Sequence, residues 1–273
     1  MKKERVDVLV FQQGLSETRE QAKRLVMAGL VYDMKNERMD KPGDKIPEGT
    51  VLQLKGEGIK YVSRGGLKLE KALEVFDISM QDNILLDIGA STGGFTDVAL
   101  QNGAIMSYAL DVGYNQLSWK LRQDPRVIVM ERMNFRYAKP ADFTEGVPDI
   151  ATIDVSFISL ELILPVLKTI LKSEGDVVAL IKPQFEAGKE FVGKHGVVRD
   201  KEVHDFVIRK ILNFAISEGY EVLALDYSPI KGGEGNIEFL VHLRWHEQFV
   251  PTEIKVEELS QQIVTKAHEQ LRK

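Results

Sequence analysis

Four charged side chains stand at positions where an enzyme built on a β-sheet can use them for chemistry. Lys182 directly follows the apolar run "DVVALI", and Asp154 directly follows the apolar run "IATI". Glu238 lies in "NIEFLV", a predicted strand in which a carboxylate is out of place. Lys68 lies on a predicted amphipathic helix over residues 65–76. Taken singly, each residue also fits a structural role, as a solvated lysine, a turn cap or half of an ion pair.

A glycine-rich turn separates the first predicted strand of this region from the helix that follows it. In "LLDIGASTGGFTDVAL", Asp87 ends the strand and we predict the helix to begin at about Phe95. The turn contains Gly89, Gly93 and Gly94. Glycines let a backbone turn tightly and approach a ligand closely, and ligands in such sheets bind at the carboxyl ends of the strands. "GASTGG" does not fit G-x-G-x-x-G, so a generic strand-to-helix turn remains an alternative.

The next predicted strand ends in a second acid, Asp111, somewhat over 20 residues after the first glycine turn. An acid at that place can bond both hydroxyls of a ribose. The turn and the acid together predict a site for a cofactor that carries a nucleoside. The residues alone leave open which cofactor it is.

The elements that must position these groups are visible from residue 66 onward, where apolar strands alternate with helical segments. We predict strands within 83–89, 106–113, 126–132, 149–156 and 176–182, and helices within 93–103, 158–171 and 200–219. This alternation predicts a parallel sheet covered on both faces. Two further strands, within 220–230 and 236–245, are joined by the short loop "KGGEG" and must therefore be antiparallel.

Residues 1–60 predict a separate, small α+β unit. Two helices are expected in "VDVLVFQQGL" and "TREQAKRLVMAGL", with Ser16 as the N-cap of the second and Gly29 as its C-cap. Short strands follow around "LVYDM" and "TVLQLKG", separated by turn residues 36–49, and "KGEGIK" marks a boundary. We therefore expect a head at 1–60, a linker at 61–65, a large α/β domain at 66–246, and an extension at 247–273 with a surface helix and no assigned function.

Composition excludes several classes of protein. The 273 residues include no cysteine, which excludes disulfides, thiolate zinc sites and a cysteine nucleophile and fits a reducing compartment. Neither a signal peptide nor a membrane span is visible, so we expect a cytoplasmic protein. Residues 1–72 carry 15 Lys and Arg against 11 Asp and Glu, whereas the remainder carries 21 against 30. A basic head favours a polyanionic partner, and an uneven spread of solvated charge explains it equally well.

The motifs in combination are more specific than any one of them. "SRGGLK", "LLDIGASTGGFTDVAL", "IDVSF", "IKPQFE" and "GNIEF", in this order, closely resemble the TlyA/hemolysin-A family, and the resemblance covers nearly the whole chain. That family joins an S4-type RNA-binding domain to an FtsJ-like methyltransferase. In the head, Arg5, "SETREQAKRLV", Gly29 and "KPGDKI" resemble the S4 pattern. Thr18 departs mildly from it, since many S4 domains have serine there.

The resemblance implies a Rossmann-like methyltransferase sheet that uses S-adenosylmethionine to methylate the 2′-hydroxyl of cytidine in ribosomal RNA. Its partners would be ribosomal RNA or ribosomal subunits, and no metal site is implied. The implied catalytic tetrad is Lys68, Asp154, Lys182 and Glu238. The implied cofactor-binding residues are Asp87, Gly89, Ser91, Gly93, Gly94, Phe95, Asp111 and Asp154. The implied RNA-binding residues are Arg5, Arg19, Lys23, Arg24 and Arg64.

Two roles remain open for Lys182 in such a reaction. As a cation it would stabilise the charge that develops on the ribose oxygen, and as a neutral amine it would accept the proton. Asp154 is expected to orient Lys182, while Lys68 and Glu238 hold the ribose and the lysine in register. Pro183 fixes the backbone just past Lys182. The loop 186–200 is expected either to close over RNA or to be a mobile surface loop.

Three other functions fit parts of the sequence. A non-catalytic RNA-binding or ribosome-assembly protein would explain the basic head but not the tetrad with the glycine turn. A pore-forming haemolysin requires a membrane-spanning or strongly amphipathic surface element, and we identify none. A nicotinamide-dependent oxidoreductase is disfavoured by the antiparallel hairpin and by the missing G-x-G-x-x-G.

Overall fold

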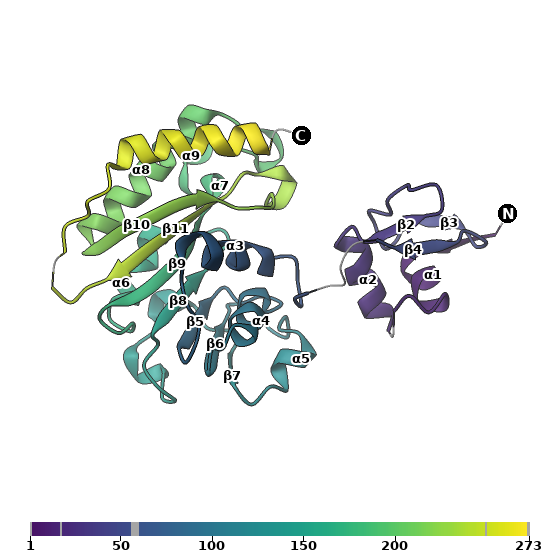
Figure 1. Ribbon diagram of the computed structural model, residues 1–273, viewed down its shortest axis with the longest axis horizontal. Helices are drawn as coiled ribbons and strands as arrows, with labels where there is room; N and C mark the ends of the chain where they lie inside the picture. The colour runs from purple at the N-terminus through teal and green to yellow at the C-terminus, as the bar shows by residue number, and fades with distance from the viewer. Residues whose placement is uncertain (1, 17, 56–59, 249, 272–273) are drawn as a thin grey trace. The chain divides into compact units, whose positions relative to one another are not determined.

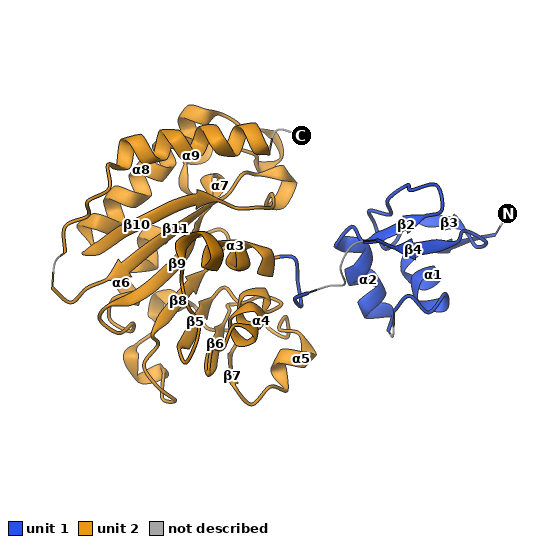
Figure 2. Cartoon of the chain, viewed as in Figure 1, with its two compact units in different colours: residues 1–64 blue, residues 65–273 orange. Residues whose placement is uncertain are grey.

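The structure is a computed structural model that describes residues 2–16, 18–55, 60–248 and 250–271. The chain divides into two compact units, Met1–Arg64 and Gly65–Lys273 (Figure 2). The expected boundary "KGEGIK" falls largely on residues 56–59, which lie outside the described residues.

The first unit has two helices and two small antiparallel sheets. Its helices are α1 (Val6–Gln12) and α2 (Arg19–Met27). Its strands are β1 (Lys3–Arg5), paired with β3 (Lys45–Pro47), and β2 (Val31–Asp33), paired with β4 (Leu52–Leu54). Apolar side chains of both helices and of the strands β2 and β4 form a core that belongs to this unit. The expected α+β head is therefore present, with an additional strand pair, β1–β3.

The ends of α2 differ in detail from the prediction. Thr18 is the N-cap, because its hydroxyl accepts a hydrogen bond from the Gln21 amide at 3.1 Å. Ser16 was the wrong choice, since it lies two residues too early for its hydroxyl to meet the first-turn amides. At the other end Ala28 is the C-cap, and Gly29 follows it with a φ of +72°. Glycine suits that left-handed position because it has no Cβ.

The second unit is built on a seven-stranded sheet in the order β10-β11-β9-β8-β5-β6-β7 (Figure 1). The strands are β5 (Ile84–Ile88), β6 (Met106–Leu110), β7 (Val127–Met130), β8 (Ile150–Ile153), β9 (Gly175–Ile181), β10 (Tyr220–Tyr227) and β11 (Phe239–Trp245). β5 to β9 run parallel, and β11 lies antiparallel between β9 and β10. The predicted fold, a mostly parallel sheet with a C-terminal antiparallel hairpin, is confirmed.

Helices cover both faces of this sheet, as Figure 1 shows. One face carries α3 (Gly66–Phe76) and α4 (Gly94–Gln101), and the other carries α8 (Lys201–Ser217) and α9 (Val256–Gln270). Two side chains of β11, three positions apart, point to opposite faces of the sheet. His242 stacks on Phe76 of α3 at 5.6 Å between ring centroids, whereas Phe239 meets His204 of α8 at 5.5 Å.

The continuous helix expected over 158–171 does not form. The segment contains a 3₁₀ turn, η3 (Leu160–Leu162), and a single α-helical turn, α6 (Leu164–Leu167). Pro165 sits in the first turn of α6, where its missing N–H is tolerated. In the middle of a longer helix it would remove a hydrogen bond and clash with the preceding turn. The apolar spacing therefore reflects buried side chains and not helical continuity.

The C-terminal helix α9 is part of the core of the second unit. Val256, Ile263, Val264 and Ala267 are buried in the same apolar cluster as α8 and the sheet. His268 of α9 also meets His204 of α8, with their ring nitrogens 2.9 Å apart. Two shorter helices complete the unit, α5 (Trp119–Arg122) and α7 (Pro183–Glu186). Among the described residues, no helix combines the length and the apolar character that crossing a membrane requires.

Candidate active site

The site lies at the carboxyl edge of the sheet, where the strand order reverses. β6 lies on one side of β5 and β8 on the other, so the loops after β5 and β8 diverge. Such a reversal point is where open α/β sheets bind ligands. Asp154 follows β8 and Lys182 follows β9, and because these strands are parallel neighbours, the two side chains leave the sheet at the same edge.

The four charged residues form one connected network. Lys182 Nζ lies 2.5 Å from Asp154 Oδ1, and Lys68 Nζ lies 3.3 Å from Asp154 Oδ2. Lys68 Nζ also lies 2.7 Å from Glu238 Oε2. Glu238 was expected inside a strand, but it directly precedes β11, which begins at Phe239. The network therefore joins α3, the ends of β8 and β9, and the start of β11.

The network contains two ammonium groups and two carboxylates that are largely removed from water. Burial by itself lowers the pKa of Lys68, but the charges of Asp154 and Glu238 and their hydrogen bonds outweigh burial, and its pKa is raised. Burial by itself raises the pKa of Asp154, and Lys68 and Lys182 outweigh this, so its pKa is lowered. Lys68 and Asp154 are thus held in their charged forms at neutral pH.

Two further residues of the same motifs support the network, and the sequence reasoning did not single them out. Ser156 accepts a hydrogen bond from Lys182 Nζ at 3.3 Å. Gln184 donates from Nε2 to Glu238 Oε1 at 3.1 Å. Both lie in the quoted motifs "IDVSF" and "IKPQFE", two residues after Asp154 and Lys182. Their position two residues after a tetrad member, inside a quoted motif, was the sequence feature that could have identified them.

Asp87 lies beneath the glycine turn and is only 1% exposed. Its Oδ2 accepts hydrogen bonds from the Thr96 amide at 3.0 Å and from the Thr96 hydroxyl at 2.8 Å. Its Oδ1 accepts from the Thr152 hydroxyl at 3.2 Å. Burial raises the pKa of Asp87 to about 7, although these hydrogen bonds oppose the shift. The carboxyl therefore ties the start of α4 to the β5 and β8 strands and does not face the open edge.

Asp111, in contrast, is partly exposed at the edge of the sheet. Its Oδ2 accepts a hydrogen bond from the Ser91 amide at 2.8 Å, and its Oδ1 accepts from the Gly113 amide at 2.7 Å. These bonds fix the carboxylate and leave further lone pairs on both oxygens. Ser91 has a φ of +48°, so the turn adopts a left-handed conformation to present this amide.

The glycine turn also touches the tetrad. Gly89 has a φ of +86°, and a Cβ built on it would lie 2.5 Å from the main-chain oxygen of Asp154. Gly93 caps α4 with a φ of +95°, and α4 begins at Gly94, one residue before the predicted Phe95. Glycine at position 89 thus lets the turn lie directly against the strand end that carries Asp154.

An exposed aromatic ring lies in the loop after Asp154. Phe157 is 90% exposed and has a φ of +64°, a conformation that phenylalanine rarely adopts. Its ring lies 4.8 Å from that of Phe185, which belongs to the "IKPQFE" motif. Lys182 Nζ in turn lies 5.9 Å from the Phe185 ring. The sequence analysis missed Phe157, because neither its exposure nor its backbone conformation is visible in a string of letters.

Two of the RNA-binding candidates of the first unit, Arg5 and Arg19, share one carboxylate. Asp7 is buried, and Arg5 Nε lies 2.9 Å and Arg19 Nε 3.5 Å from it. The hydrogen bond from Arg5 is the main cause of the lowered pKa of Asp7. Lys23 pairs with Glu20 at 3.0 Å. Arg5 and Arg19 thus share the single negative charge of Asp7. Arg24 is partly buried and Arg64 is exposed.

Comparison with known proteins gives the same division of the chain. Residues 61–245 match the model of the FtsJ-like methyltransferase family, and residues 4–32 match the S4 domain. Hemolysin A of Brachyspira hyodysenteriae is 43% identical over 87% of this chain and 98% of its own length. The chain belongs to the TlyA/hemolysin-A family.

Other members of the TlyA/hemolysin-A family are similar over comparable lengths. The 16S/23S rRNA (cytidine-2′-O)-methyltransferase TlyA of Mycobacterium tuberculosis is 41% identical over 88% of this chain and 89% of its own. A solved structure from Streptococcus thermophilus, named as a candidate hemolysin, superimposes with a TM-score of 0.79. It is 60% identical and covers 100% of this chain and 98% of its own.

Proposed function

We propose that the protein transfers the methyl group of S-adenosylmethionine to the ribose 2′-hydroxyl of a cytidine in ribosomal RNA. The observation that carries this proposal is the Lys68–Asp154–Lys182–Glu238 network, which lies against the glycine turn at the carboxyl edge of the sheet. The names of the relatives in M. tuberculosis and in Campylobacter jejuni, both (cytidine-2′-O)-methyltransferases, support the substrate. Because the proposed substrate is ribosomal RNA, we propose that the reaction takes place in the cytoplasm.

The residues at the edge of the sheet fit S-adenosylmethionine. The Asp111 carboxylate, fixed by two backbone amides, retains lone pairs for the two hydroxyls of the adenosyl ribose. The turn at Gly89 offers main chain without a side chain next to Asp154. When bound, the cofactor supplies an electrophilic methyl group on a positively charged sulfur. Ser91, Gly93, Gly94 and Phe95 would hold it through the turn, and Asp87 would hold the turn itself.

Lys182 would act on the ribose hydroxyl directly. Its ammonium has three N–H groups, and Asp154 and Ser156 accept two of them. The third is left for the 2′-oxygen, whose growing negative charge it would stabilise. Only 9% of the Lys182 side chain is exposed, so water screens this interaction weakly. Pro183 at the start of α7 fixes the main chain immediately after it.

The other members of the tetrad would position the reacting groups. Asp154 holds both lysines, one with each oxygen, and its negative charge offsets the positive charge near the methyl donor. Lys68 bridges Asp154 to Glu238, and Gln184 fixes the second oxygen of Glu238. Because reaction rates depend steeply on alignment, holding the ribose oxygen in line with the methyl group would supply several kcal/mol.

The exposed Phe157 ring fits the base of the target nucleotide. Proteins that recognise single-stranded RNA commonly take up unstacked bases, and these bases pack on aromatic side chains. Phe157 lies three residues after Asp154, and its exposed ring packs against the ring of Phe185. We propose that stacking on Phe157 holds the cytidine over Lys182.

The first unit would bind RNA without taking part in the chemistry. We propose an RNA-binding domain at residues 1–60, a linker at 61–65 and a methyltransferase domain that begins at residue 66 and includes α9, which fits the S4 match to residues 4–32 and the separate cores. Arg5, Arg19, Lys23, Arg24 and Arg64 are the candidates for phosphate contacts. Phosphate contacts set the position of RNA without reading its sequence.

Mass mapping of ribosomal RNA tests this function. Unmethylated 16S and 23S transcripts and subunits are incubated with the protein and S-adenosylmethionine, then digested to nucleosides. We expect one added methyl group on the ribose of a cytidine, and far slower formation of this product when Lys182→Ala replaces the wild type. A methyl group on a base, or no methylation of any ribosomal RNA or subunit by the wild type, would show that the proposed reaction is wrong.

A further inference from the structure

Two lysines from opposite faces of the sheet meet at one tyrosine ring. Lys71 of α3 places Nζ 3.6 Å from the ring centroid of Tyr227, and Lys266 of α9 places Nζ 5.7 Å from it. Tyr227 is the last residue of β10, the edge strand that α3 and α9 flank from its two faces (Figure 1). A cation close to an aromatic face is attracted by the ring.

This cluster lies at the same edge of the sheet as the tetrad. Tyr227 pairs with Phe239, and Phe239 pairs with Ile181, the residue before Lys182. Two strand spacings of about 4.8 Å place Tyr227 roughly 10 Å from that strand end. On α3, Lys71 follows the tetrad residue Lys68 by three positions, so the two lysines share one side of the helix. An RNA strand whose ribose lay at Lys182 would bring a neighbouring phosphate toward Tyr227.

Within the cluster, Lys71 is committed to internal contacts. Its Nζ donates to the Tyr227 carbonyl at 2.6 Å and lies 3.1 Å from Asp226 Oδ2. Lys71 therefore fixes the end of β10 and the orientation of the ring. Among the residues that the structure describes, Lys266 has no carboxylate partner, and the Tyr227 hydroxyl makes no hydrogen bond. The exposed Lys266 ammonium thus lies over the Tyr227 ring, 5.7 Å from its centroid.

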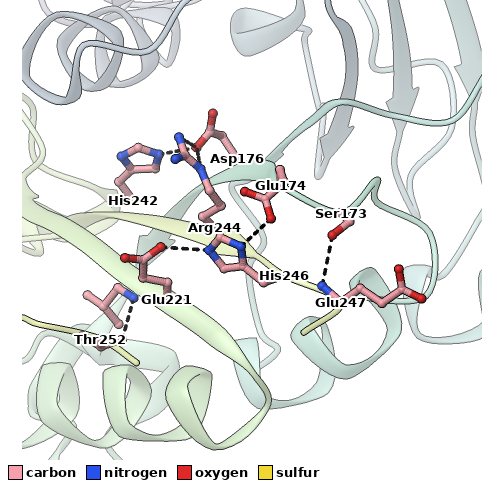
Figure 3. Close-up of polar contacts among 10 residues, drawn as sticks. Ser173, Glu174, Asp176, Glu221, His242, Arg244, His246, Glu247 and Thr252 are labelled. Carbon is pink, nitrogen blue, oxygen red and sulfur yellow. Dashed lines mark hydrogen bonds and ion pairs between the residues drawn. The ribbon is translucent and has the colours of Figure 1, made fainter. Parts of the chain in front are cut away.

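At the other end of β9, β10 and β11, away from Tyr227, basic side chains are paired with carboxylates. There Asp176 accepts hydrogen bonds from His242 at 2.8 Å and from Arg244 at 2.8 Å (Figure 3). His246 lies between Glu174 and Glu221, at 2.8 Å and 2.9 Å. Carboxylates thus neutralise the cations at that end. Lys255, the N-cap residue of α9, pairs with Glu258 at 2.9 Å, whereas Lys266 near the C-terminal end of the helix has no such partner in the described part of the chain.

We propose that Lys266 and the Tyr227 hydroxyl bind one phosphate of the RNA strand that flanks the methylated ribose, with Lys71 holding Tyr227 in place. This inference rests on the proposed function, since it assumes that the ribose lies at Lys182. Lysine and tyrosine side chains are common partners of nucleic-acid phosphates, and such contacts fix the register of the strand without reading its bases. The site would thus set which ribose along a bound strand reaches Lys182.

Salt dependence of RNA binding tests this proposal on the full-length protein, with an unmethylated 23S ribosomal RNA transcript as the probe. Lys266→Gln removes one cation at an exposed position. We expect the slope of log affinity against log salt to fall by about 1, and affinity at low salt to fall on the order of 3- to 10-fold. Lys266→Arg, which keeps the positive charge, is expected to have the wild-type salt slope and the wild-type affinity at low salt. Lys255→Gln, on the same helix at the other end, leaves both unchanged.

Tyr227→Phe tests the hydroxyl while it keeps the ring for Lys71. We expect on the order of 3-fold weaker RNA binding and an unchanged affinity for S-adenosylmethionine. If both groups bind one phosphate, the double variant Tyr227→Phe/Lys266→Gln loses less affinity than the two single losses combined.

The outcomes separate this inference from the proposed function. If the wild type methylates the RNA and Lys266→Gln keeps the wild-type salt slope, or if the effects of the two variants are independent, the phosphate site is refuted and the proposed function stands. If the wild type neither binds nor methylates ribosomal RNA, the proposed function fails and this inference fails with it.

Discussion

At the scale of residues, the tetrad is best understood as one unit centred on Asp154. Both of its oxygens are engaged by lysines, so removing this carboxylate would leave two cations in a partly buried place. Breaking a buried ion pair from one side costs several kcal/mol, because the remaining charge is uncompensated. Truncation of Asp154 would therefore disturb both lysines, whereas truncation of Lys182 leaves Asp154 paired with Lys68. Lys182 is for that reason the cleaner position to change.

Lys182→Ala is expected to leave the affinity for S-adenosylmethionine nearly unchanged, because the cofactor is proposed to rest on the turn after β5 and on Asp111. Methyl transfer should slow by on the order of 10²-fold or more, the usual loss for a charge-stabilising or acid–base group. A single-turnover assay at saturating RNA and cofactor measures this, with Lys255→Ala as the control. Transfer at the wild-type rate would reduce Lys182 to a structural residue.

Lys182→Arg separates the two roles of the lysine. Arginine keeps the positive charge but does not release a proton at neutral pH. Substantial transfer by this variant in the same assay would favour charge stabilisation over proton abstraction. Loss of activity would be consistent with either role, because the guanidinium is larger and planar.

Asp111→Ala is expected to weaken binding of S-adenosylmethionine by about 1–3 kcal/mol, the scale of a lost hydrogen bond to a charged group. Titration calorimetry measures the effect. Glu74→Ala, an exposed acid on α3, serves as the control. Unchanged affinity would remove Asp111 from the cofactor site.

At the scale of elements, parallel strands bring distant residues to one edge. β5, β8 and β9 each end in a loop that carries part of the site, and the buried Asp87 carboxyl ties the first two of these ends together through Thr96 and Thr152. The strand β5, which supports the glycine turn, thus contains a buried acid, Asp87. Its protonation links the stability of this region to pH.

The sign of that linkage follows from the raised pKa of Asp87. Between about pH 4 and 7 the folded protein retains a proton on Asp87 that the unfolded chain releases, so this group contributes stability that is lost as pH rises through that window. Asp87→Asn keeps the geometry without the charge. We expect the variant to gain stability relative to the wild type from pH 5 to pH 8, by on the order of a few kcal/mol.

Urea unfolding of both proteins at several pH values measures this difference. The Asn side chain can still accept from Thr96 and donate to the Thr152 hydroxyl, so the local hydrogen bonds persist. A difference in unfolding free energy that stays constant from pH 5 to pH 8 would contradict the raised pKa of Asp87.

At the scale of the whole molecule, the chain has two units with separate cores, and we propose that the first contributes most of the RNA binding while the second carries out the reaction. The first unit gathers Arg5 and Arg19 around Asp7, and the second contains the complete tetrad and glycine turn. Such a division lets one unit supply affinity for RNA while the other supplies the reaction.

Deletion of residues 1–60 is expected to leave the binding of S-adenosylmethionine intact, because every proposed cofactor contact lies in the second unit. Methylation of ribosomal RNA should be lost, and the salt dependence of RNA binding should flatten as phosphate contacts disappear. Calorimetry and methyl-transfer assays on the truncated protein check both. Normal methylation without the first unit would refute the proposed division of labour.

Much of this protein was determined by local sequence. The alternation of apolar strands with helices predicted the parallel sheet, and the position of Lys182 and Asp154 after such strands predicted one shared edge, because parallel strands end together. The motifs around these residues identified the family. These features depend on neighbours in the chain and on periodicity, which a sequence displays directly.

The tertiary structure decided what depends on contacts between distant segments. It buried Asp87 beneath the glycine turn, exposed Phe157, and paired the three-residue strands β1 and β3, which are too short to show a period. It also brought Lys71 and Lys266, which are 195 positions apart, to Tyr227. That meeting requires β10 at the sheet edge between α3 and α9, and strand order is set by the packing of the whole chain, which no local pattern records.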